Sequence, residues 1–152
     1  MGRSLPIFDG VIEKPAGQPA SFESNKSNQE STDQAWFHQL TSSGLAIGFA
    51  KSRVSGDRYA LVSAGRSELS AALDQTLGAA GFDGVDPAAA GFVMMRVVNY
   101  SAYLLVSRIQ ERVWPIRVPS EYPVSSGMPL ADCIELLGGL PAAIGVRRGL
   151  LS

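Results

Sequence analysis

The chain has 152 residues, a formal net charge of −1, one cysteine and one histidine. This length is enough for one domain whose core needs no metal, and the single cysteine excludes an intrachain disulfide. The balanced charge argues against nucleic acid as a partner, and no apolar run reaches the roughly 18 residues of a membrane span. We therefore expect a soluble chain of the cytoplasm, or of a virion or other particle assembled there, without cofactor or metal.

The first 34 residues are predicted to form an extended arm that becomes ordered on a partner. Residues 13–34 carry Phe22 as their only large apolar side chain, so this segment alone buries too little surface to offset its ordering entropy. The apolar side chains of the arm would anchor it on a neighbouring protein: Leu5, Ile7, Phe8, Ile12 and Phe22. A solvated linker is the simpler alternative. Residues 35–152 are expected to form a single compact domain.

Between residues 33 and 90 the pattern predicts a short helix, a hairpin and a longer helix. Asp33 is a good N-cap for a helix over Asp33–Leu40. Two apolar runs, Gly44–Val54 and Tyr59–Ala64, flank a polar loop with one glycine, which is typical of a hairpin. Small residues on one face of the first run would permit close packing: Gly44, Ala46, Gly48 and Ala50. The clearest helix is Ser67–Ala80, because leucines recur at positions 69, 73 and 77.

The segment 91–118 is predicted to form the core of the fold as three consecutive strands, Phe92–Asn99, Ala102–Ile109 and Val113–Val118. Both faces of the first strand are apolar, which is typical of a strand covered on both sides. Pro115 cannot donate to a ladder, so the third strand is predicted to lie at an edge. One long helix over the first two runs is the alternative, but their valine and aromatic content favours strands.

Pro129 is predicted to open a short C-terminal helix, Leu130–Leu137, which two glycines close. Together these elements predict an α+β fold with a mainly antiparallel sheet of about five to six strands. We expect the sheet to resemble a sandwich or barrel, with one main helix and the extended N-terminal arm.

No residue pattern predicts a catalytic, cofactor or metal site. His38 would need an orienting group and a nucleophile, and none lies near it in sequence. Cys133 has acidic neighbours, which oppose a reactive thiolate. The acidic loop 83–86 lacks the further oxygen ligands of a calcium loop, and the glycines of 78–84 follow a helix instead of preceding one. Three arginines form a short basic stripe: Arg108, Arg112 and Arg117. A pI near 5.8 nevertheless argues against a nucleic-acid-binding surface.

The expected function is that of a non-enzymatic assembly subunit whose arm docks onto neighbouring subunits, as in a virion head or tail or a bacterial secretion or conjugation machine. The low charged fraction of 18% is consistent with a surface that neighbours partly cover. One alternative is a small enzyme or small-molecule-binding domain with a pocket between the sheet and the helix at 67–80, formed with Arg96, Tyr100 or Asp57. The third is a one-to-one adaptor, chaperone or inhibitor that uses an apolar patch or an edge strand.

Overall fold

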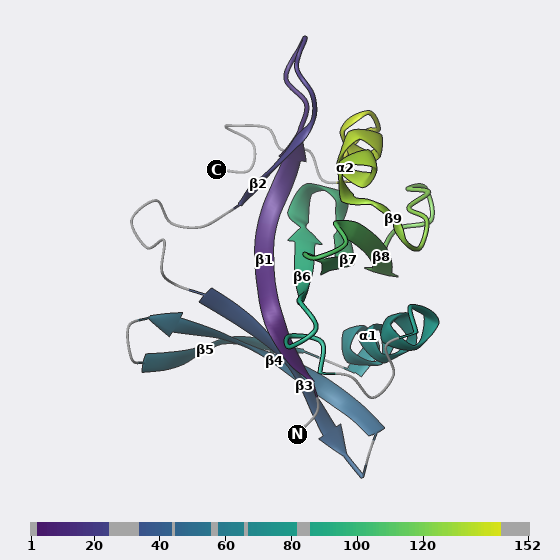
Figure 1. Ribbon diagram of the computed structural model, residues 1–152. Helices are drawn as coiled ribbons and strands as arrows, with labels where there is room; N and C mark the ends of the chain where they lie inside the picture. The colour runs from purple at the N-terminus through teal and green to yellow at the C-terminus, as the bar shows by residue number, and fades with distance from the viewer. Residues whose placement is uncertain are drawn as a thin grey trace.

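The computed structural model describes residues 3–24, 34–43, 45–55, 58–65, 67–81 and 86–143. Within these residues one mixed sheet of nine strands runs through the molecule and two α-helices pack against it (Figure 1). In chain order the elements are β1 (Ser4–Glu13), β2 (Ser21–Ser24), β3 (Gln34–Ser42), β4 (Leu45–Ser55), β5 (Arg58–Gly65), α1 (Ser67–Ala79), β6 (Phe92–Val97), the 3-10 turn η1 (Val98–Tyr100), β7 (Ala102–Ser107), β8 (Arg112–Arg117), β9 (Met128–Pro129) and α2 (Leu130–Gly138).

The strand order is β5-β4-β3-β1-β6-β7-β8-β9, and β2 pairs with β1 beside this path. All pairs are antiparallel except β1–β6, which is parallel. A parallel pair needs a long crossover, and the chain between β1 and β6 supplies one that includes α1. The α+β class is confirmed. The expected sandwich or barrel of five to six strands is wrong, because the sheet is open and has strands where an arm and a helix were predicted.

The predicted arm is the main error, because β1 lies in the middle of the sheet. Residues 4–7 of β1 pair with β3 on one side, and residues 7–10 pair with β6 on the other. Leu5, Ile7 and Ile12 are buried in the core. The segment has little apolar surface when considered alone, but the ladders on both sides supply partners that lie far away in sequence. Residues 25–33 of the predicted arm lie outside the described residues.

The two aromatic anchor residues also pack inside the molecule. Phe8 and Phe22 are partly buried against the core on the α2 side of the sheet. The ring of Phe22 lies over Gly10, where an added Cβ would come within 2.5 Å of the ring and within 2.3 Å of the Glu23 carbonyl oxygen. An aromatic side chain that covers a glycine on the neighbouring strand is a known way of stabilising a sheet. The five anchor residues therefore hold β1 and β2 in place within the chain.

The helix predicted at Asp33–Leu40 is wrong, since these residues from Gln34 onward form strand β3. Phe37 and Gln39 point to the same face and are buried, and the Gln39 amide donates to the Ser70 carbonyl oxygen at 3.1 Å. Tertiary pairing with β1 and β4 overrides the local capping signal. The predicted hairpin, the three strands after residue 91 and both later helices are confirmed, with boundaries shifted by a few residues.

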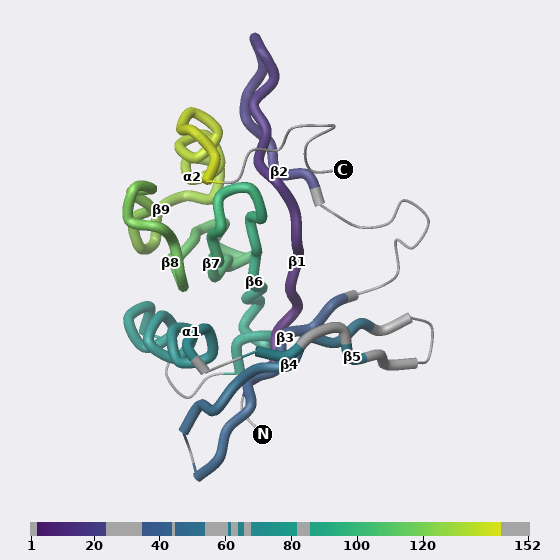
Figure 2. Tube along the Cα trace, turned by 180° about the vertical axis from the view of Figure 1, so that it is seen from behind, coloured from purple at the N-terminus to yellow at the C-terminus, as the bar shows by residue number. Residues whose placement is uncertain are grey.

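Helices cover both faces of β6 and β7, as the apolar character of the first strand predicted. The α1 face carries one buried cluster, comprising Leu5, Ile7, Phe37, Leu69, Leu73, Leu77, Phe92, Met94, Leu105, Trp114 and Ile116. The α2 face carries a second cluster that includes Val93, Met95, Val97, Leu104, Val106 and Leu137. In Figures 1 and 2, β3–β5 cross the direction of β6–β8 steeply, and α1 lies in the angle between these two parts. The strong twist therefore gives α1 contacts with both β4 and β8.

Candidate functional site

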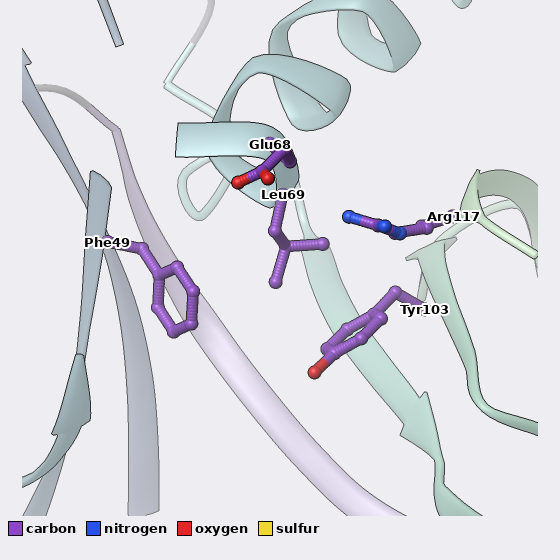
Figure 3. A pocket seen from close by; sticks show the side chains of 5 residues that line it. All are labelled: Phe49, Glu68, Leu69, Tyr103 and Arg117. Carbon is purple, nitrogen blue, oxygen red and sulfur yellow. The ribbon is translucent and has the colours of Figure 1, made fainter. Parts of the chain in front are cut away.

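A cleft of about 310 Å³ opens beside the first turn of α1, between β4 and the strands β7 and β8. Its walls come from these four elements: Phe49, Glu68, Leu69, Tyr103 and Arg117 (Figure 3). The buried Leu69 points from α1 into the cleft, and Phe49 forms the opposite apolar wall. Phe49 is held in place by stacking on Phe37, with ring centroids 5.1 Å apart. The volume is at the lower end of the range of about 300–1,000 Å³ for small-molecule sites.

The register of four neighbouring strands explains why polar groups gather here. One cross-strand row is apolar and belongs to the core under α1: Ile7, Met94, Leu105 and Trp114. The next row toward the open end is polar: Asp9, Arg96, Tyr103 and Arg117. A β-bulge between β7 and β8 separates these rows, and bulges commonly redirect a side chain. Because α1 covers the apolar row, the cleft lies where the polar row begins.

The charges around the cleft are only partly paired. Asp9 forms an ion pair with Lys51, while its Oδ1 is buried without a hydrogen-bond partner among the described atoms. The Arg96 guanidinium lies over the ring of Tyr103, 5.9 Å from its centroid. Among the described residues, the side chains of Tyr103 and Arg117 have no hydrogen bond or ion pair. The cleft therefore has an apolar floor and an unpaired cationic wall.

Of the three residues named in advance for a pocket on this side of the sheet, two are described, and of these Arg96 lies next to the cleft. The Tyr100 hydroxyl instead donates to the Leu140 carbonyl oxygen at 2.8 Å on the α2 side. Asp57 lies outside the described residues. Sequence reasoning did not name Phe49, Glu68, Leu69 or Tyr103 as pocket residues, because their approach depends on the steep crossing of the two parts of the sheet. Arg117 was noted only as part of a basic stripe.

His38 lies on β3, and each of its ring nitrogens is hydrogen-bonded to a serine hydroxyl. Nδ1 is 2.9 Å from the Ser4 hydroxyl, and Nε2 is 2.7 Å from the Ser52 hydroxyl. A Ser–His–Asp triad needs a carboxylate on one of these nitrogens to orient the ring. The arrangement instead ties β1, β3 and β4 together on the face of the sheet that points away from α1.

Cys133 lies inside α2 with no exposed surface, and burial raises the pKa of its thiol to about 11. At neutral pH the thiol is therefore almost entirely protonated and a poor nucleophile. Among the described residues, no three His, Cys, Asp or Glu side chains are close enough to hold a metal ion together. The first three residues of the acidic loop 83–86 lie outside the described part of the chain.

The second candidate site is the outer end of the sheet at β4 and β5. Strand β5 pairs only with β4, so one of its edges has no strand beside it in the described structure. Large apolar side chains are exposed on these two strands: Leu45 by 71%, Ile47 by 58% and Leu61 by 70%. On β4 a close approach occurs at Gly48, where an added Cβ would lie 2.7 Å from the Gly65 carbonyl oxygen of β5. The partner in that contact is the neighbouring strand of the same chain.

No known family model matches the chain, and neither a characterised protein nor a solved structure is significantly similar to it. Within the described residues, no helix has both the length and the apolar character needed to cross a bilayer.

Proposed function

We propose that this chain is a non-catalytic subunit that associates with a second copy of itself through the free edge of β5. This proposal keeps the assembly role expected from the sequence and moves the contact from the N-terminal segment to the opposite end of the sheet. A virion or a secretion machine remains the proposed setting for such a subunit. The free edge of β5 is the observation that carries the proposal.

The two ends of the sheet differ in how well they are protected against pairing. At one end β9 has only two residues, and short edge strands are a common way of preventing association. At the other end β5 has eight residues, contains no proline and has one charged residue, Arg58. A long and mostly uncharged edge is a template for another strand. In the described part of this end, a bulge between β4 and β5 is a protective feature.

A second copy is the partner that this edge fits best. Two identical edges can pair antiparallel about a two-fold axis, so each supplies the donors and acceptors that the other needs. Arg58 stands at the start of β5, and antiparallel pairing would place the two Arg58 residues at opposite ends of the shared ladder. Leu61, near the middle of the strand, would then lie close to its counterpart and lose part of its contact with water.

The test is light scattering coupled to size exclusion, performed on the full chain and on two matched variants. Leu61→Lys puts a charge in the middle of the edge, and Ile109→Lys puts the same charge on a similarly exposed side chain in the turn between β7 and β8. We expect the full chain and Ile109→Lys to reach twice the chain mass of 16.1 kDa. We expect Leu61→Lys to weaken association by about tenfold or more.

Two results would overturn the proposal. A full chain that stays monomeric up to high micromolar concentration has no self-association to explain. Equal association of all three proteins would show that the contact lies away from β5. Circular dichroism of each variant confirms that the substitutions have not unfolded the chain.

A further inference from the structure

We propose that the cleft beside α1 binds a small molecule in which one carboxylate is attached to an apolar body, either aromatic or aliphatic. This inference is independent of the β5 contact, because none of the described residues that line the cleft lies on β5. It rests on the cleft itself, on its apolar floor and on the arrangement of charges around it.

The apolar part of the site accounts for the body of the ligand. Leu69 and Phe49 face each other across the cleft, and Tyr103 adds a second aromatic ring (Figure 3). A flat ring or a short aliphatic chain between these side chains would remove apolar surface from water on both sides. Small-molecule sites usually combine such a lining with a few polar groups that orient the ligand.

The cationic wall accounts for the carboxylate. Arg117 reaches toward the centre of the cleft in Figure 3, and it has no ion pair with another described residue. Its planar guanidinium can bind a carboxylate through two parallel hydrogen bonds. Arg96, next to the Tyr103 ring, adds a second positive charge behind this wall.

Among the described residues of the lining, Glu68 is the one anionic group, and it argues at first for a cationic ligand. It stands in the first turn of α1, where the positive end of the helix dipole already stabilises its carboxylate. Asp9, the nearest other anion in the polar row, forms an ion pair with Lys51. With Arg117 and Arg96 unmatched by ion pairs and Glu68 stabilised by its own helix, the site favours an added negative charge.

Three probes that share one apolar body test this assignment: 4-phenylbutyrate, 4-phenyl-1-butanol and 4-phenylbutylamine. Each is titrated into the full-length ¹⁵N-labelled chain, and the amide signals of Leu69 and Tyr103 report occupancy of the cleft. We expect the carboxylate to bind about tenfold or more tightly than the alcohol, since a charge-assisted hydrogen bond is worth more than a neutral one. The amine should bind most weakly.

The variants identify the group that recognises the carboxylate. Arg117→Gln should remove the preference for 4-phenylbutyrate, whereas Arg108→Gln, an exposed arginine in the turn between β7 and β8, should leave it intact. Glu68→Gln should strengthen binding of the carboxylate. Preference for the amine would overturn the proposal, and so would 4-phenylbutyrate at millimolar concentration leaving both reporter signals unmoved.

Discussion

The side chain of Asn99 exchanges two hydrogen bonds with the backbone of Ile12, which lies 87 positions earlier in the chain. The Ile12 amide donates to Asn99 Oδ1 at 3.1 Å, and Asn99 Nδ2 donates to the Ile12 carbonyl oxygen at 2.9 Å. Strand β6 ends at Val97, so it offers no backbone partner to Ile12. The side-chain amide of Asn99, in the turn that follows, makes these two hydrogen bonds instead. Both residues are buried, so the pair fastens the far end of β1 to the core.

Substitution of Asn99 should therefore destabilise the whole molecule. Asn99→Leu leaves the Ile12 N–H and C=O buried without partners, which should cost about 2–4 kcal/mol. Asn99→Asp keeps the acceptor but loses the donor, and when ionised it places a negative charge against the Ile12 carbonyl oxygen. We expect Asn99→Asp to be destabilised as well, in urea unfolding followed by circular dichroism. Unchanged midpoints for both variants would contradict this role of Asn99.

Deletion of residues 1–13 should unfold the chain, because β3 and β6 would lose the strand between them. A milder test uses two leucines that differ in burial. Leu5→Ala, at a position with no exposed surface, should lower the free energy of unfolding by about 2–5 kcal/mol. Leu45→Ala, at a position that is 71% exposed, should change it by less than about 0.5 kcal/mol. If the deletion variant folded, residues 1–13 would be dispensable for the fold, as the predicted N-terminal arm requires.

Stability should fall at alkaline pH because of Cys133. Burial raises the pKa of this thiol from 9.0 to about 11, so the folded state disfavours the thiolate. The contribution is complete below pH 9, where the thiol is protonated in both states, and is lost as the pH rises through 11. We expect a loss of about 2 kcal/mol over this interval.

Cys133→Ala is the control and should make the alkaline slope of the free energy of unfolding shallower. Some slope should remain, because burial also raises the pKa of Tyr100 and the pKa of Tyr122 above 10.0. An identical slope with and without the thiol would show that Cys133 reaches solvent in the folded state.

At acid pH the connection between α2 and the β1–β2 hairpin should weaken. Hydrogen bonds from Lys14 and from the Ala20 amide lower the pKa of Glu135 below 4.5. A lowered folded-state pKa stabilises the fold above the unfolded value, and this stabilisation is lost as pH falls through the folded value. Glu135→Gln should reduce the loss of stability below pH 4.5, whereas Glu111→Gln, at an exposed turn, should leave it unchanged. Urea midpoints measured from pH 3 to 7 give the comparison.

The elements that the sequence predicted correctly are those with a strong local pattern. The leucine spacing of α1 and the apolar runs of β6, β7 and β8 mark their elements without help from the rest of the chain. Strand β1 has no such signal, since Pro6, Asp9 and Gly10 interrupt its apolar residues and its partners lie far along the chain. In β3 the capping residue suggested a helix, and pairing on both sides outweighed that preference.

The candidate sites were harder to predict than the elements that form them. A position between the sheet and α1 was expected for a pocket, but its lining depends on a bulge and on the steep crossing of the strands. The sequence around Phe49 or Tyr103 predicts neither the bulge nor the crossing. The edge at β5 depends on strand order, which local patterns do not specify.

Amide hydrogen exchange of β5 is the sharpest test of pairing between two copies, because it reports on the edge itself. Amides of β5 directed away from β4 should exchange rapidly in dilute solution and become protected at high protein concentration. The same amides of Leu61→Lys should stay unprotected at both concentrations. Protection in β5 that does not change with concentration would contradict pairing through this edge.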